Sequence, residues 1–192
     1  MSKPNTANTC VTTTAMPRPE LLKQTYESFQ KGMPWLDFKR MTLYLNIDMF
    51  PNTQGREQIP EILEIAKSTF GKVICRNELE VLSTIPSFPA AIKWLFTKAD
   101  SEFVFNLEDD WLLLEEVPEN IFSYFENNPD IMQIGLRAWK LSEPRFVLSP
   151  SIMRSSFCNL VAKDIVMHKN PEKQIRGINP YNPAKSFLYW PF

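Results

Sequence analysis

The sequence of 192 residues contains little of several residue types on which common kinds of site depend. It has one histidine, His168, which excludes a metal site built from several histidine ligands. No recognisable motif surrounds this histidine, so a Ser-His-Asp or Cys-His hydrolase is disfavoured. Glycine occurs five times and never as a Walker-type phosphate loop, so an ATPase of that class is not expected.

Long apolar runs, a strong net charge and closely spaced cysteines are missing too. No apolar run approaches the roughly 18 residues that cross a bilayer, and the polar N-terminus lacks the apolar core of a signal peptide. Three scattered cysteines, Cys10, Cys75 and Cys158, favour a reducing compartment over a disulfide framework or a zinc site. The net charge of −1 gives no general attraction to nucleic acid. We therefore expect a soluble, cytoplasmic protein with no transmembrane segment and no nucleic-acid partner.

The order of the predicted strands and helices indicates an α/β protein. Apolar residues at helical spacing, such as Leu22, Tyr26 and Phe29, alternate along the chain with short apolar or β-branched runs. This alternation predicts a mostly parallel central sheet flanked by helices. We expect a flexible tail over 1–9 and a single domain over 10–192. Strands are predicted over 11–15, 42–50, 72–76, 103–107, 131–136 and 146–148, and helices over 19–29, 61–70, 89–99, 118–127 and 154–163.

Three consecutive acids, Glu108, Asp109 and Asp110, close the otherwise apolar strand over 103–107. Carboxylates at the end of a buried strand repel one another and lose solvation, and a divalent cation would offset that cost. In α/β sheets this end of a strand is also where ligands bind. Carboxylate oxygens with open positions left for phosphate suit Mg²⁺ or Mn²⁺. The plain alternative is an acidic strand end that is only solvated.

Four segments in a fixed order carry a resemblance to a known family. A strand leads through Arg18-Pro19-Glu20 into a helix, and a second strand ends at Asp48. A helix with Ala90-Ala91-Ile92-Lys93 then precedes the strand that ends in Glu108-Asp109-Asp110. This pattern resembles the nucleotide-sugar glycosyltransferases of the GT-A fold, close to family 2, whose DxD-type motif the acidic triplet matches. The resemblance covers residues 10–112 well and 113–175 loosely.

The resemblance implies a GT-A fold, with a Rossmann-like, mostly parallel sheet and a reduced C-terminal acceptor region. Residues 10–112 would form the nucleotide-binding half and residues 113–192 the acceptor half. The implied activity is the metal-dependent transfer of a sugar from a nucleoside-diphosphate sugar to a glycan or other hydroxyl acceptor, with Mn²⁺ or Mg²⁺ as cofactor. The sequence predicts neither the sugar, the base nor the oligomeric state.

The resemblance also assigns a role to each matching position. Asp110 would bind the metal, Glu108 and Asp109 would face the ribose and the metal's water shell, and Asp48 would accept a hydrogen bond from the base. The remaining implied nucleotide contacts are Thr13, Thr14, Arg18, Arg76 and Lys93. Simpler readings exist for most of them: Asp48 as a turn aspartate, the threonines as β-branched strand residues, and Arg76 and Lys93 as solvated surface cations.

Two downstream acids are candidates for the general base of an inverting enzyme. Glu172 has the better spacing and is preferred over Asp164, although Pro171-Glu172 is also a common first-turn pair of a helix. His168 could complete the metal shell, as a C-terminal histidine does in some GT-A enzymes.

Two other classes of function remain open. One is a catalytically weak GT-A-like module that binds a nucleotide or glycan, because the glycine-rich acceptor loop usual in the family is missing. The other is a metal-dependent nucleotidyltransferase or phosphohydrolase. It would normally need a second acidic cluster for a second metal, and only Glu115-Glu116 offers one.

Overall fold

The computed structural model describes residues 8–48, 55–77, 87–136, 146–176 and 187–190. Within these residues the strands form one seven-stranded sheet in the order β3-β2-β1-β4-β6-β5-β7. All strands run parallel except β6, which is antiparallel to both of its neighbours, β4 and β5. The predicted α/β class and mostly parallel sheet are confirmed. The strands are β1 (Thr9–Ala15), β2 (Thr42–Ile47), β3 (Lys72–Asn77), β4 (Phe103–Glu108), β5 (Gln133–Leu136), β6 (Ser151–Arg154) and β7 (Phe187–Trp190).

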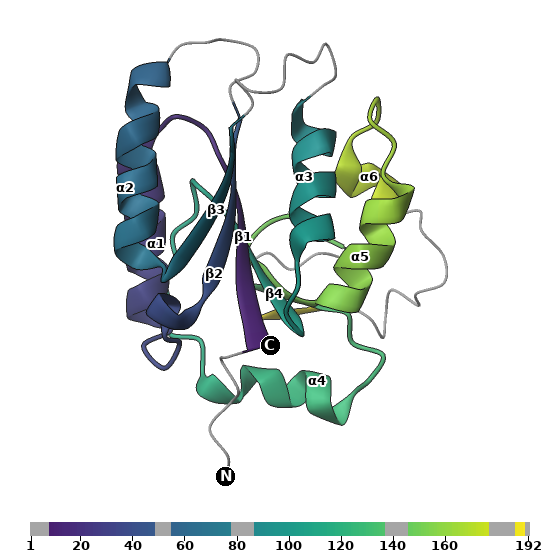
Figure 1. The fold of residues 1–192 in the computed structure, drawn as a ribbon. Coiled ribbons are helices and arrows are strands. Elements are labelled where there is room, and N and C mark those ends of the chain that lie inside the picture. Colours follow the sequence, from purple (N-terminus) through teal and green to yellow (C-terminus); the bar gives the residue numbers. More distant parts are fainter. Residues whose placement is uncertain (1–7, 49–54, 78–86, 137–145, 177–186, 191–192) are drawn as a thin grey trace.

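Helices cover both faces of the sheet (Figure 1). On one face α1 packs against α2, and on the other α3 packs against α5 and α6. A 3₁₀ turn over Glu119–Phe122 continues into the short helix α4 at the end of the sheet where β1 begins. The helices are α1 (Pro19–Gly32), α2 (Ile59–Thr69), α3 (Ser87–Lys98), α4 (Ser123–Asn127), α5 (Ser155–Asp164) and α6 (Pro171–Arg176).

Helix α1 shows how the sequence determines these elements. Pro19 stands at its start, where a missing N–H costs nothing, and Glu20 lies in its first turn, where a negative charge is favoured. Leu22, Tyr26 and Phe29 form its buried stripe, as their spacing predicts. Their side chains join the apolar core between the sheet and α1, and a second core fills the space between the sheet, α3 and α5.

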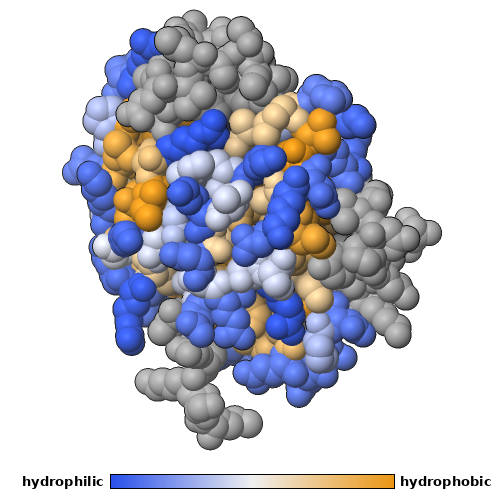
Figure 2. Space-filling view, turned by 45° about the vertical axis from the view of Figure 1, so that its right-hand side comes forward, coloured by the Kyte–Doolittle hydropathy of each residue, from blue (hydrophilic) through white to orange (hydrophobic). Residues whose placement is uncertain are grey.

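No helix in the described ranges is long and apolar enough to cross a membrane. The face on the side of α5 and α6 is mostly hydrophilic, with separate apolar patches (Figure 2).

Most predicted elements are found within a few residues of their expected ends. Strand β1 begins at Thr9, inside the segment expected to be a tail, and residues 1–7 lie outside the described part of the chain. Residues 49 and 50 of the predicted second strand lie outside it as well. The predicted helix over 118–127 is a 3₁₀ turn followed by five α-helical residues.

The prediction of a strand over 146–148 is wrong, and β6 at Ser151–Arg154 was not predicted. The 146–148 segment is buried, but the backbone of Val147 and Leu148 bonds to side chains of β5 and β4 and joins no strand. Strand β6 is four residues long, too short for the sequence to show a pattern of its own. The pairing with β4 and β5 stabilises β6, so its position depends on tertiary structure.

Candidate functional site

A row of polar side chains crosses the sheet near the carboxyl ends of four parallel strands. The strand register aligns Arg76 of β3 with Asn46 of β2, Asn46 with Thr14 of β1, and Thr14 with Glu108 of β4. Aligned residues of neighbouring strands share a face of the sheet, and here it is the face covered by α3, where Tyr44 of β2 packs. Arg76 Nη1 lies 3.5 Å from Asn46 Oδ1. The row therefore has a cation at one end and a carboxyl group at the other.

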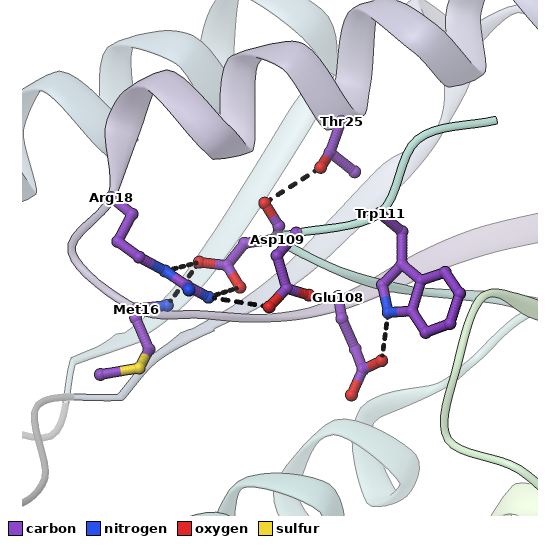
Figure 3. Close-up of polar contacts among 7 residues, drawn as sticks. Met16, Arg18, Thr25, Glu108, Asp109 and Trp111 are labelled. Atoms are coloured by element: carbon purple, nitrogen blue, oxygen red, sulfur yellow. Dashed lines mark hydrogen bonds and ion pairs between the residues drawn. The ribbon is translucent and has the colours of Figure 1, made fainter. Parts of the chain in front are cut away.

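Arg18 connects the two acids that follow β4, Asp109 and Asp110, to the start of α1 (Figure 3). Asp109 is buried, and its carboxylate accepts hydrogen bonds from Arg18 Nε at 3.2 Å, Arg18 Nη2 at 2.7 Å and the Met16 N–H at 2.9 Å. Its carbonyl oxygen accepts a further hydrogen bond from Thr25 Oγ1 at 3.0 Å. Burial raises the pKa of Asp109 more than its bonds to Arg18 and Met16 lower it. Asp109 and Arg18 thus bind chiefly to each other and fix the strand end.

Asp110 is the accessible acid of the triplet. Its side chain is 47% exposed, and its Oδ2 lies 3.3 Å from Arg18 Nη2. Because this ion pair is solvated and longer than the Arg18–Asp109 pair, Asp110 can take a second ligand at little cost.

Glu108 is the most perturbed carboxyl group at this end of the sheet. Burial, and after it the negative charges of Asp110, Glu172 and Asp109, raise its pKa to about 7. The hydrogen bond from Trp111 Nε1 to Glu108 Oε2, 2.7 Å long, opposes this rise (Figure 3). The carboxyl groups gathered here therefore lack full charge compensation.

The structure brings Glu172 to this acidic group and leaves Asp164 elsewhere. Glu172 lies in the first turn of α6, close enough to Glu108 for their charges to interact, and its Oε1 lies 3.4 Å from the backbone nitrogen of Leu148. Asp164, at the end of α5, is exposed and lines a shallow cavity of about 630 Å³ beside Lys169. His168 is exposed in the connection between α5 and α6.

The other predicted nucleotide contacts lie in different environments. Thr13 is fully buried and points to the α1 face, because neighbouring residues of a strand point to opposite sides, so the structure does not bring it to the polar row. Asp48 follows β2 directly, and its N–H donates to the Ala15 carbonyl oxygen at 2.7 Å. Lys93 is half-buried in the middle of α3.

Three buried amides near the site were missed from the sequence: Asn46, Asn106 and Gln133. Asn46 Nδ2 is buried and has no hydrogen-bond partner among the described residues. Polar side chains inside apolar strand runs were the available signal for the two asparagines, since an amide is seldom buried without a partner.

Comparisons with known proteins bear on the fold. No protein-family model and no curated protein matches this sequence. Among solved structures, the chain is similar to TarS 1–349 from S. aureus in complex with UDP, with a TM-score of 0.59 and 15% identity over 95% of this chain and 60% of that one. A mannosyltransferase from Pyrobaculum calidifontis, in complex with GDP-Man and Mn²⁺, gives a TM-score of 0.54 and 9% identity over 91% of this chain and 55% of that one. A cytidylyltransferase from Leptospira borgpetersenii gives a TM-score of 0.56 and 13% identity over 96% of this chain and 76% of that one.

At this level of identity the similarity shows the fold alone. The chain has a GT-A fold, as the sequence resemblance implies. It spans 60% of the TarS chain and 55% of the mannosyltransferase chain, little more than half of each.

Proposed function

We propose that this protein is a metal-dependent glycosyltransferase that moves a sugar from a nucleoside-diphosphate sugar to a glycan or other hydroxyl acceptor. The observation that carries the proposal is the exposed Asp110 at the carboxyl end of β4, next to Glu108 and to the polar row that runs to Arg76. Ligands bind at this edge of α/β sheets. Support for the donor class comes from the similar structures solved with UDP and with GDP-Man and Mn²⁺.

The residues at this edge suit a hard divalent cation, Mn²⁺ or Mg²⁺, shared with the donor. The described residues contain no group of three acid, histidine or cysteine side chains arranged to hold a metal ion. Mg²⁺ is commonly held by one or two carboxylates together with substrate phosphates, so a complete protein cage is not required. Asp110 would be the protein ligand, with His168 as a second candidate. When bound, the metal would stabilise negative charge on the leaving diphosphate.

The chain's own residues divide into two tasks. Arg76, Thr14 and Glu108 form the polar row on which the nucleotide would lie, next to Asp48 at the end of β2. Lys93 stays a predicted nucleotide contact, whereas Thr13 is not carried over, because it is fully buried on the α1 face of the sheet. Arg18 and Asp109, by contrast, would serve the donor site by fixing the acidic strand end.

Glu172 is the proposed general base, which would take the proton from the acceptor hydroxyl as the sugar is transferred, with inversion. Replacing Glu172 by glutamine should lower the transfer rate by about 10²- to 10⁴-fold, the usual contribution of such a group, and leave nucleotide affinity within about twofold. Asp164→Asn is the matched control, because Asp164 is an exposed acid at the end of α5 and is not among the charges that act on Glu108. If Asp164→Asn lost transfer and Glu172→Gln kept it, the assignment would be reversed.

Calorimetric titration tests the donor site directly. UDP, GDP and dTDP should be titrated with Mn²⁺ and with EDTA into the wild type, Asp110→Ala and Glu116→Ala, which removes an exposed acid farther along the same segment. We expect one nucleotide to bind with Mn²⁺ only, to be lost in Asp110→Ala and to be kept in Glu116→Ala. Absence of binding for every nucleotide would refute the glycosyltransferase proposal.

A nucleotidyltransferase is the second candidate, because the similarity to the cytidylyltransferase covers 76% of that chain at a TM-score of 0.56. The two reactions release different products: a nucleotidyltransferase given CTP and a sugar phosphate releases pyrophosphate, whereas a glycosyltransferase releases a nucleoside diphosphate from its donor. A module that only binds nucleotide would release neither, and Glu172→Ala would then change nothing.

A further inference from the structure

Residues 146–150, just before β6, form a buried segment that belongs to no strand. Buried backbone N–H and C=O groups need partners, and outside a strand ladder these must come from elsewhere. Two buried carboxamides supply them: Gln133 of β5, 1% exposed, and Asn106 of β4, 2% exposed. The segment is therefore held by Gln133 and Asn106, two side chains that are not part of the polar row.

Gln133 binds Val147 on both of its backbone groups. Its Nε2 donates to the Val147 carbonyl oxygen at 2.6 Å, and its Oε1 accepts from the Val147 N–H at 3.1 Å. Gln133 Nε2 also donates to Ser151 Oγ of β6 at 2.9 Å. Because the Val147 carbonyl belongs to the same peptide group as the Leu148 N–H, Gln133 fixes the orientation of that N–H.

Asn106 holds the next carbonyl along the segment. Its Nδ2 donates to the Leu148 carbonyl oxygen, and its Oδ1 accepts from Thr12 Oγ1 of β1 at 2.9 Å. The hydroxyl of Thr12 therefore determines which way the carboxamide of Asn106 faces. Leu148 is thus fixed from β5 on one side and from β4 and β1 on the other.

The Leu148 N–H fixed in this way points at Glu172 Oε1, at 3.4 Å. Glu172 itself stands in the first turn of α6, which is only six residues long. A helix this short has little stability of its own, so contacts from outside decide where its side chains lie. The hydrogen bond from the Leu148 N–H is a contact from outside the helix that holds the Glu172 carboxylate in place.

We propose that Asn106 and Gln133 are positioning residues. Their hydrogen bonds to the backbone of Val147 and Leu148 place the Glu172 carboxylate. This inference rests on the proposed function, in which Glu172 is the base. Displacing a base by about 1 Å can cost 10²-fold in rate without weakening the binding of substrate. The two carboxamides would therefore act on the transfer step and leave donor binding unchanged.

Kinetics provide the first test. With the nucleoside-diphosphate sugar whose nucleotide binds in calorimetry, Asn106→Leu and Gln133→Met should lower kcat by about 10- to 100-fold, with KM for the donor within about twofold. Thr12→Val, which only removes the hydroxyl that orients Asn106, should lower kcat in the same direction and is the variant least able to disturb folding. The matched control is Thr69→Val, which removes a buried hydroxyl bonded to Ile65 in α2, away from the site. An unchanged kcat in folded Asn106 and Gln133 variants would overturn the proposal.

NMR provides a second test that needs no substrate. In the wild type, Glu172→Gln should move the backbone amide resonance of Leu148, because the N–H faces this carboxylate. In the Thr12→Val and Gln133→Met backgrounds the same substitution should move that resonance much less. An equal movement in all backgrounds would overturn the positioning proposal. A failure of the wild type to bind any nucleotide would instead overturn the proposed function, while the NMR comparison would still decide whether the carboxamides place Glu172.

Discussion

Replacing Glu108 by glutamine should stabilise the protein at pH 8 and leave its stability nearly unchanged below pH 4.5. The Glu108 carboxyl has its pKa raised from 4.5 to about 7, first by burial and then by the charges of Asp110, Glu172 and Asp109. Glutamine keeps the shape of the side chain and an oxygen that can accept the hydrogen bond from Trp111 Nε1. The substitution thus removes the charge and preserves the main contact.

The sign follows from proton binding in the two states. The folded protein holds the Glu108 proton more tightly than the unfolded chain, so the stability from this group is complete below pH 4.5 and is lost as the pH rises through about 7. Each tenfold difference in proton affinity corresponds to 1.36 kcal/mol, which gives a loss of about 3 kcal/mol at pH 8. Glu108→Gln should therefore raise the free energy of unfolding at pH 8 by up to that amount.

Urea unfolding followed by tryptophan fluorescence, at pH values from 4.5 to 8.5, measures this difference. Glu116→Gln is the matched control, because Glu116 is exposed and its removal should give the wild-type pH dependence. The difference between wild type and Glu108→Gln should grow between pH 5 and pH 8. Parallel pH profiles for the two proteins would refute the reasoning, since they would mean that Glu108 keeps its ordinary pKa in the folded state.

Two further predictions concern stability. Arg18→Ala should lower the free energy of unfolding by roughly 3 kcal/mol, because it leaves the buried carboxylate of Asp109 without its partner. Arg18→Lys should be more stable than Arg18→Ala but less stable than the wild type, because lysine keeps the charge and lacks the bidentate geometry. If urea unfolding of Arg18→Ala matched the wild type, the pair of Arg18 with Asp109 would contribute nothing to stability. Gly71→Ala should cost about 1 to 3 kcal/mol, because a Cβ there would meet the backbone carbonyl of Lys39. Thermal unfolding should show a smaller loss for Gly32→Ala, where the new Cβ mainly meets the flexible end of a leucine side chain; equal losses would contradict this account.

Several features of the fold could be read from the sequence because they depend on local patterns. The stripe of Leu22, Tyr26 and Phe29 predicts α1, and the alternation of such helices with apolar strand runs predicts a parallel sheet. The ordered segments ending in Glu108-Asp109-Asp110 led to the GT-A resemblance, which the structure confirms at the level of the fold. In a parallel sheet, acids that follow a strand must lie at its ligand-binding edge, so their general place followed as well.

Which of these residues face one another was decided by the tertiary structure. Strand alternation puts Thr13 and Thr14 on opposite faces, but only the packed helices show that Thr14 shares a face with Arg76, Asn46 and Glu108. In the same way, sequence spacing could not distinguish Asp109, which bonds to Arg18, from its accessible neighbour Asp110.

The C-terminal part depended on tertiary contacts most of all. Strand β6 enters the sheet between β4 and β5 against the direction of both, and the carboxamides of Gln133 and Asn106 replace a strand as partners of residues 147 and 148. Those contacts connect residues far apart in the chain, and no local pattern encodes them. The sequence by itself therefore determined the elements as far as β5, their order and the acidic edge of the sheet, whereas only the three-dimensional packing placed β6 and brought Glu172 within electrostatic reach of Glu108.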